Sequence, residues 1–293
     1  MEKIRNKQVL PDITELEALC RIAQQKSFNP QLCSRVRQSN NKVILGKSEF
    51  AGTQKYCPGD EIRFINWRTS ARSNELQVQQ QYLEQNNRWY ICIDSSASMG
   101  LPDTNKWLLS IQVACAISYI LLNTGNQLSI IFFDEKVNGF IPLGLGKRQF
   151  KKIYLSLQQH HPRPKGGDSL LHRCIPLLKT PSKTLIISDF LKPDMMKTDL
   201  KYLAAMKNQI HILHVMEQQE YLLTQTDLIL SDIESGGTQH FNTTTENINR
   251  VRENFKQQPL ELKSFCQKHG YHYSFSNTNQ GWQDATIKLI RML

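Results

Sequence analysis

The stretch Trp89-Tyr90-Ile91-Cys92-Ile93-Asp94-Ser95-Ser96-Ala97-Ser98 decides the fold class of this 293-residue chain. Its first five residues form a continuous apolar run, which is typical of a strand buried on both faces of a parallel sheet. The carboxylate of Asp94 and the hydroxyls of Ser96 and Ser98 come directly after that run. Because open α/β folds place their ligand crevices at the carboxyl ends of strands, the stretch predicts a buried strand with a polar site at its end.

Further apolar strands alternate with helical segments toward the C-terminus. We expect strands 89–93, 128–133, 184–188 and 210–215 to be neighbours in one sheet. Shorter strands are predicted at 137–143, 227–230, 238–242 and 271–275. Helical spacing covers 107–122, 150–157, 169–178, 195–206, 245–268 (interrupted at Pro259) and 282–292. The alternation predicts an α/β fold with a doubly wound, mostly parallel sheet flanked by helices.

The first 87 residues differ in character from the rest. An amphipathic helix is predicted over 13–25, and Leu76, Val78 and Tyr82 alternate with glutamines as in a half-buried strand. We therefore divide the chain into an N-terminal extension with a helix and short strands (1–87) and an α/β domain (88–293).

Composition bounds the class of partner and the compartment. The 36 Lys and Arg against 26 Asp and Glu give a formal charge of +10, which favours anionic partners. Seven cysteines without a Cys-x-x-Cys pair argue against a disulfide framework. The N-terminus shows no apolar signal segment, and stretch 107–122 looks too short and too mixed to cross a bilayer. These features predict a cytoplasmic protein without a membrane span.

A second acidic residue, Asp189, follows the 184–188 strand. If the two strands are neighbours, Asp94 and Asp189 lie side by side, and a cation between them would relieve their repulsion. A carboxylate and hydroxyls suit Mg²⁺, or Mn²⁺, which take oxygen ligands. The alternative is that Ser96 and Ser98 cap the next helix. Asp103 and Thr104 already provide that helix start.

Two sequence blocks together resemble a known family. Residues 94–100 (Asp-Ser-Ser-Ala-Ser-Met-Gly) resemble the metal-ion-dependent adhesion site of von Willebrand factor A domains. Upstream, 46–50 (Gly-Lys-Ser-Glu-Phe), 56–67 (Tyr-Cys-Pro-Gly-Asp-Glu-Ile-Arg-Phe-Ile-Asn-Trp) and 70–72 (Ser-Ala-Arg) resemble the bacterial family catalogued as domain of unknown function fifty-eight. The resemblance covers about residues 10 to 293.

This resemblance implies a von Willebrand factor A-like fold and a function without catalysis. The chain would be a metal-dependent protein-binding adaptor. Its implied partners are a MoxR-type AAA+ ATPase and a client protein whose assembly or maturation it assists.

The resemblance also implies the metal ligands, with one departure. In the loop 166–170 (Gly-Gly-Asp-Ser-Leu), Asp168 stands where the family has a metal-site Thr. The implied ligands are Asp94, Ser96, Ser98, Asp168 and Asp189. Three carboxylates around one divalent ion would give a net charge near −1. Alternatively, Ser169 supplies the hydroxyl in place of Asp168 after a small loop shift, and the sequence leaves both possibilities open.

The upstream block shows no catalytic pattern. Lys55 and Asn66 replace a family Arg and Asp. Gly59, Asp60 and Trp67 are expected as turn and core elements that pack this segment onto the α/β layer. Three arginines are expected in internal salt bridges with nearby acids rather than in anion binding: Arg63, Arg68 and Arg72.

Two other function classes remain as alternatives. A metal-dependent phosphoester hydrolase could use the same acidic cluster, but no dedicated His or Lys lies beside the motif as a base. Nucleic-acid binding through the +10 charge lacks a recognised module, and is disfavoured. His211 and His214 are expected as core or edge histidines on opposite faces of a strand. The basic cluster Lys147, Arg148, Lys151 and Lys152 is expected as a solvated helix face.

Overall fold

The structure is a computed structural model. It describes residues 10–25, 35–37, 48–56, 65–73, 75–84, 88–101, 105–163, 168–217, 227–231, 238–242 and 245–293.

A six-stranded sheet forms the centre of the molecule, in the order β11-β8-β7-β4-β5-β6. The pairings are parallel except for β6, which runs antiparallel to β5. This order confirms that the four strands predicted to be neighbours are adjacent, with β4 between β5 and β7. The strands are β4 (Arg88–Asp94), β5 (Gln127–Phe133), β6 (Val137–Gly144), β7 (Lys183–Ser188), β8 (Gln209–Met216) and β11 (His272–Asn277).

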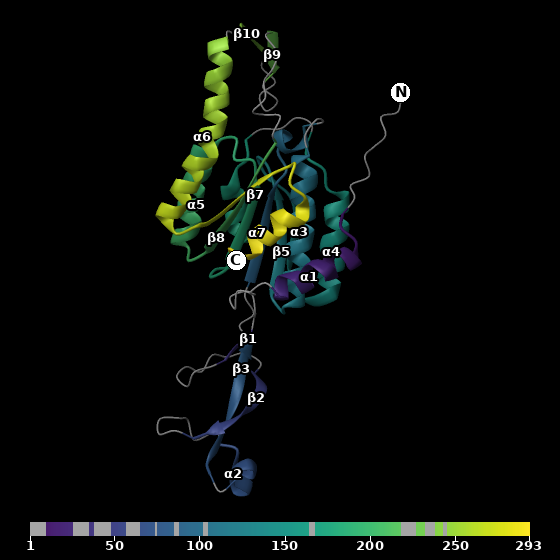
Figure 1. Cartoon of the computed structure of the whole chain (residues 1–293), viewed down its shortest axis with the longest axis vertical. Helices are drawn as coiled ribbons and strands as arrows, with labels where there is room; N and C mark the ends of the chain where they lie inside the picture. Colours follow the sequence, from purple (N-terminus) through teal and green to yellow (C-terminus); the bar gives the residue numbers. More distant parts are fainter. Residues whose placement is uncertain are drawn as a thin grey trace.

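Helices cover both faces of this sheet (Figure 1). One core contains Trp89, Ile91 and Ile93 of β4 together with α1, α3, α4 and α7. The other contains Tyr90 and Cys92 together with α5, α6 and the 3₁₀ segment η4. Alternate residues of β4 therefore enter opposite cores, which explains the continuous apolar run. The segments are α1 (Ile13–Gln25), α3 (Lys106–Asn123), α4 (Gly146–Gln159), η4 (Leu171–Leu177), α5 (Pro193–Ala205), α6 (Thr245–His269) and α7 (Trp282–Ile290).

Two predicted helices differ from expectation. The 169–178 segment is the 3₁₀ helix η4, and Pro176 inside it cannot donate a backbone hydrogen bond. Helix α6 is continuous through Pro259. The Gln258 side chain donates to the carbonyl oxygen of Phe190 at 2.6 Å, and Leu262 is buried in the core. These contacts hold the segment against the α/β layer on both sides of the proline.

Helix α1 packs against the α/β layer. Its side chains Leu16 and Leu19 are buried in the core that includes α3. A small antiparallel sheet, β1-β3-β2, forms a separate unit with helix α2. Figure 1 shows this arm projecting away from the six-stranded sheet. Its elements are β1 (Arg35–Arg37), β2 (Ser48–Lys55), α2 (Trp67–Ser73) and β3 (Gln77–Glu84).

The arm corrects one prediction about the upstream block. Trp67 is 63% exposed, so it is not a core residue. Asn66 precedes α2, and its side-chain oxygen accepts a hydrogen bond from the amide of Thr69 at 3.1 Å. Since Asp and Asn cap helices about equally well, this departure preserves the helix start. Lys55 pairs with Glu75 at 2.7 Å on the surface.

The prediction that Arg63, Arg68 and Arg72 form internal salt bridges stays untested. Arg68 and Arg72 are exposed. Arg63, Gly59 and Asp60 lie outside the described residues.

The predicted hairpin is present as β9 (Asp227–Ser231) paired with β10 (Thr238–Asn242).

Helix α3 differs from the prediction that no segment could cross a membrane. Among the described residues, it is the one helix long and apolar enough to cross a membrane, contrary to the sequence-based expectation. Most of it is buried inside the protein, between the sheet and its neighbouring helices.

Candidate metal site

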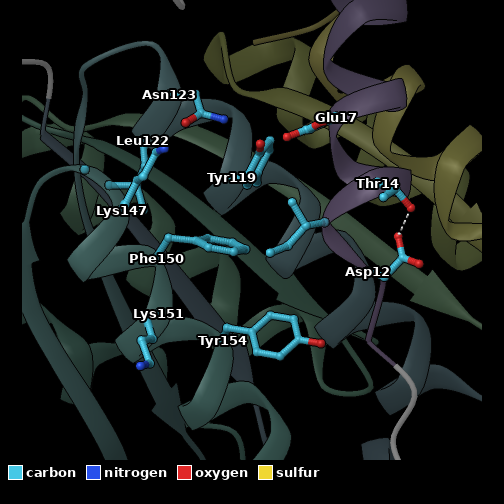
Figure 2. Close-up of a pocket in the computed structure, with 12 residues that line it drawn as sticks. Asp12, Thr14, Glu17, Tyr119, Leu122, Asn123, Lys147, Phe150, Lys151 and Tyr154 are labelled. Atoms are coloured by element: carbon cyan, nitrogen blue, oxygen red, sulfur yellow. Dashed lines mark hydrogen bonds between the residues drawn. The ribbon is translucent and has the colours of Figure 1, made fainter.

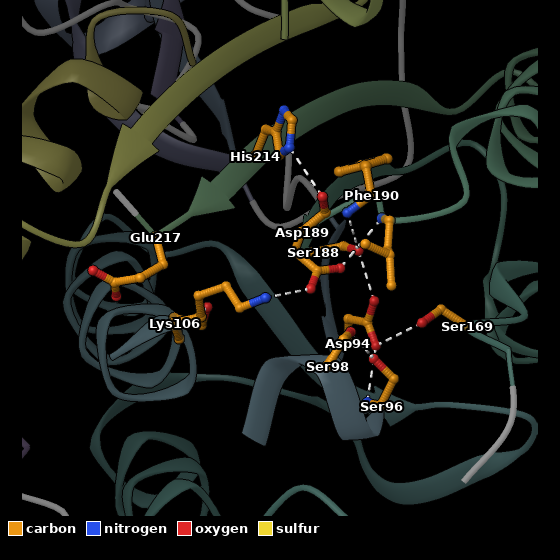
Figure 3. Close-up of polar contacts among 12 residues, drawn as sticks. Asp94, Ser96, Ser98, Lys106, Ser169, Ser188, Asp189, Phe190, His214 and Glu217 are labelled. Atoms are coloured by element: carbon orange, nitrogen blue, oxygen red, sulfur yellow. Dashed lines mark hydrogen bonds and ion pairs between the residues drawn. The ribbon is translucent and has the colours of Figure 1, made fainter. Parts of the chain in front are cut away.

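The carboxylate of Asp94 lies at the end of β4 and is fully buried. Its Oδ1 accepts hydrogen bonds from the amide of Ser96 at 3.0 Å and from the hydroxyl of Ser169 at 2.9 Å. Its Oδ2 accepts one from the hydroxyl of Ser188 at 2.6 Å. Figure 3 shows these groups converging on Asp94 from three separate segments.

The two serines of the motif complete this cluster. The hydroxyls of Ser96 and Ser98 lie 3.1 Å apart, and both residues are buried. Ser96 precedes the short 3₁₀ helix η3 (Ala97–Gly100) but makes no side-chain capping hydrogen bond. Helix α3 begins after Asn105. The geometry therefore favours a polar site over the capping alternative.

Asp189 lies next to this cluster, because β7 pairs in parallel with β4. Its Oδ2 is 2.8 Å from the ammonium nitrogen of Lys106. Lys106 is 1% exposed and Asp189 is 4% exposed, so this is a buried ion pair. The sequence predicted that Asp94 and Asp189 would both be unpaired. In the structure, the ammonium group of Lys106 pairs with Asp189.

Lys106 is a site residue that sequence reasoning missed. It is the first residue of α3 and the only charged residue in that 18-residue helix. A lone lysine at the start of an apolar helix is the signal that could have identified it. Glu217, also buried, accepts a hydrogen bond from the amide of Asn105 at 3.2 Å, and Figure 3 shows it on the other side of Lys106 from Asp189.

The structure separates the two candidates in the 166–170 loop. The carboxylate of Asp168 forms an ion pair with Lys192, and both side chains are partly exposed. The hydroxyl of Ser169 is the group that contacts Asp94. Across the described part of the chain, no three His, Cys, Asp or Glu side chains converge as metal ligands would. Asp94, Asp168 and Asp189 are thus not gathered around one point.

Burial controls the electrostatics of Asp94. Desolvation and the negative charge of Asp189 raise the pKa of this carboxyl, hydrogen bonds from Ser188 and Ser96 oppose the shift, and the resulting pKa is about 6. The site therefore favours a positive charge beside Asp94.

His214 of β8 contacts the backbone of Asp189. Its Nε2 is 3.0 Å from the carbonyl oxygen of Asp189, and its Nδ1 is 2.8 Å from the hydroxyl of Tyr273. Since a carbonyl only accepts, Nε2 carries the proton and Nδ1 accepts from the tyrosine. Burial lowers the pKa of His214 to about 4. His211 and His214 are both fully buried, as predicted, and His211 stacks on His272.

The donor set fits a hard divalent cation. One carboxylate and the hydroxyls of Ser96, Ser98 and Ser169 are oxygen ligands of the kind that Mg²⁺ and Mn²⁺ take, with water completing the shell. The charge of Asp189 is already balanced by Lys106.

Comparison with known proteins gives one family and several distant relatives. The family model described as "Protein of unknown function DUF58" matches residues 53–263. Uncharacterised proteins of Mycobacterium tuberculosis and Mycobacterium bovis are 26% identical over 201 residues. The aligned region covers 66% of this chain and 63% of those relatives. It therefore spans less than two thirds of their length.

Three solved structures share 12% sequence identity with this chain. The conserved hypothetical protein BatB from Bacteroides thetaiotaomicron has a TM-score of 0.43 and covers 70% of this chain and 97% of its own. An aerotolerance-related membrane protein from Bacteroides fragilis has a TM-score of 0.43, with coverages of 71% and 100%. An uncharacterised membrane-spanning protein from Vibrio fischeri has a TM-score of 0.26, with coverages of 68% and 94%.

Two of the three solved structures are described as membrane proteins. Helix α3 of this chain is itself long and apolar enough to cross a membrane. The expectation of a cytoplasmic protein without a membrane span is therefore not retained. The comparisons do not show the expected MoxR-type AAA+ partner.

Proposed function

The chain belongs to the DUF58 family of proteins of unknown function, and on that premise we propose that it is a non-enzymatic, metal-dependent protein-binding adaptor. One observation carries the proposal. Groups from three segments converge on the buried carboxylate of Asp94 at the carboxyl edge of β4. The mostly parallel sheet with its site at this edge supports a von Willebrand factor A-like domain.

The residues that would hold Mg²⁺ or Mn²⁺ are Asp94, Ser96, Ser98 and Ser169. When bound, the ion would supply a positive centre that accepts a carboxylate oxygen from a partner protein. Lys106 keeps Asp189 neutralised beside the site, and Ser188 holds the second oxygen of Asp94 in place.

Charge favours an acidic partner more strongly than the sequence alone suggested. Three carboxylates around a divalent ion would leave a net charge of 2 − 3 = −1. With Asp168 on Lys192 and Asp189 on Lys106, only Asp94 is uncompensated, and the sum becomes 2 − 1 = +1. An ion in this setting attracts an acidic side chain, since less of its charge is neutralised by the protein.

No specific contact favours the phosphoester hydrolase alternative. Both ring nitrogens of His214 are engaged, and the ammonium of Lys106 is held by Asp189. A general base needs a free position within hydrogen-bond reach of the proton that it removes.

A capture experiment tests the proposal. Immobilised protein should retain its partner from a host lysate in Mg²⁺ and release it when a chelator is added. Asp94→Ala should capture nothing above background, whereas Asp168→Asn, a matched loss of a carboxylate outside the cluster, should capture as the wild type does. Capture that ignores both the chelator and Asp94→Ala contradicts the proposal, as does phosphatase turnover that Asp94→Ala abolishes.

A further inference from the structure

A pocket of about 680 Å³ lies between α1, α3 and α4. Its walls are mainly apolar, and Figure 2 shows the rings of Phe150 and Tyr154 facing its interior. Tyr119 meets Phe150 edge to face, with ring centroids 5.2 Å apart. Ile13 and Leu122 complete the apolar lining. This volume is within the range of ligand pockets, and apolar walls with few polar groups are typical of them.

The pocket is distinct from the Asp94 site. Lys106, at the first residue of α3, contacts the site, whereas Asn123, at the last residue, lines the pocket. At 1.5 Å per residue, the two ends of this helix are about 25 Å apart. A ligand in the pocket therefore does not touch the proposed metal ligands.

Positive charge gathers at one end of the pocket. Lys147 and Lys151 line it from α4, and Figure 2 shows both on the side opposite Asp12. Asp12 caps α1, accepting hydrogen bonds from the Thr14 hydroxyl at 2.6 Å and the Glu15 amide at 2.8 Å. Glu17, the other acid of the lining, also belongs to α1. The acids and the lysines thus lie on different walls.

Helix α4 is strongly basic in its N-terminal half. Its 14 residues include Lys147, Arg148, Lys151 and Lys152, and no acid. All four basic side chains are exposed. Leu145 precedes the helix and supplies no side-chain cap, so the positive end of the helix adds to the lysines at the pocket.

Apolar side chains are exposed beside these charges. Leu145 and Leu155 project into solvent at the start and in the body of α4, and Ile13 projects at the start of α1. Basic side chains next to exposed apolar ones on an amphipathic helix are the pattern of binding to an anionic bilayer surface. The basic cluster is a solvated helix face, as predicted, and exposed apolar side chains accompany it.

We propose that this pocket binds the acyl chain of an anionic lipid drawn from a bilayer surface, with Lys147 and Lys151 at the lipid head group. The aromatic walls and Ile13 contact the chain, while Arg148 and Lys152 contact neighbouring head groups. The proposal rests on α1, α3 and α4 alone and is independent of the metal site.

Flotation of the full chain with vesicles tests it. We expect binding to vesicles of phosphatidylcholine with phosphatidylglycerol and little binding to phosphatidylcholine alone. The double variant Lys147→Gln/Lys151→Gln should weaken binding about tenfold or more, because each basic residue near an anionic surface contributes substantially. The double variant Lys263→Gln/Lys268→Gln, with the same charge change on exposed positions of α6, should bind as the wild type does.

A pocket-filling variant separates the acyl site from general surface attraction. Ile13→Trp enlarges an exposed side chain of the lining, so folding should be preserved, which circular dichroism verifies. It should lower lipid binding although it adds apolar surface. Unchanged or tighter binding of Ile13→Trp overturns the acyl site. Absence of wild-type binding to the anionic vesicles, or binding only to a monomeric fatty acid in solution, overturns the bilayer source.

Discussion

Two aspartate–lysine pairs at the same edge of the sheet differ strongly in burial. Lys106 and Asp189 have exposed fractions of 1% and 4%, whereas Lys192 and Asp168 have 49% and 37%. The sequence predicted both aspartates as metal ligands, and in the structure each has its own lysine. The buried pair is part of the core beneath the site, and the exposed pair lies in water beside it.

The difference shows how burial determines the effect of a charge. An exposed pair contributes little, since water and salt screen it. In a buried pair, the loss of one partner leaves the other charge without compensation in a low-dielectric interior. The comparison therefore predicts a large asymmetry between variants that look alike in sequence.

The largest effect is expected at Lys106. Lys106→Met should lower the free energy of unfolding by about 3–5 kcal/mol, because Asp189 is left buried and unpaired. Urea denaturation without divalent ions measures this. The double variant Lys106→Met/Asp189→Asn should recover much of the loss, as partners in one ion pair are strongly coupled. Equal losses from Lys106→Met and Lys192→Met would remove the basis of the comparison.

The neutral neighbour of the buried pair should show an intermediate effect. The hydroxyl of Ser188 donates to Asp94 and accepts from the amide of Phe190 at 3.0 Å, where Phe190 has a left-handed backbone with φ of 49°. Ser188→Ala should destabilise by about 1–3 kcal/mol, since it leaves buried polar groups unsatisfied. Thermal unfolding would measure the loss, and a stability equal to the wild type would show that these hydrogen bonds are replaceable.

The partly buried imidazole of His160 should make the stability of the protein depend on pH. Desolvation lowers the pKa of His160 to about 4, and its ring stacks on Phe132 with centroids 3.9 Å apart. The unfolded chain binds a proton near pH 6.5 and the folded chain does not. The stability that His160 contributes is therefore present above pH 6.5 and is lost as the pH falls toward 4.

The contribution is about 1–2 kcal/mol after allowance for the partial hydration of the ring. Denaturant unfolding at several pH values measures it, with His160→Phe as the matched variant that keeps the aromatic contact. A pH slope in this range that His160→Phe does not reduce would contradict the assignment.

The smallest effect is expected at the exposed pair. Asp168→Asn and Lys192→Met should each change the free energy of unfolding by less than about 1 kcal/mol, as is usual for surface ion pairs. The same denaturation assay in low and high salt checks this. A loss as large as that of Lys106→Met would show that the 168–170 loop depends on this pair.

The sequence predicted the sheet well, for a simple physical reason. Strands buried on both faces must be apolar throughout, so 89–93, 128–133, 184–188 and 210–215 are visible as continuous runs. The same argument placed Asp94, Ser96 and Ser98 at the carboxyl edge and Asp189 beside them. Lys106 and Ser188 were missed because their roles depend on side-chain direction across segments 80 or more residues apart.

The remaining differences also concern tertiary contacts. Whether Asp168 or Ser169 contacts Asp94 depends on a shift of one residue along the loop. A loop has no repeating pattern of residues from which such a shift could be predicted. Trp67 was expected to help pack the upstream block onto the α/β layer, yet it lies on the projecting arm and is exposed. Residue type predicted burial correctly in the regular strands and helices of the α/β layer, but not in the loop and the arm.

The most direct test of the central claim, a cation site centred on Asp94, is the melting temperature as a function of Mg²⁺ concentration. An ion that binds only the folded state should stabilise by about 2.7 kcal/mol at a hundredfold excess over its Kd. The account predicts that the melting temperature rises in wild type and in Asp168→Asn, rises less in Ser169→Ala, and does not rise in Asp94→Asn. A wild-type melting temperature that ignores millimolar Mg²⁺ and Mn²⁺, or a rise that persists in Asp94→Asn, would contradict it.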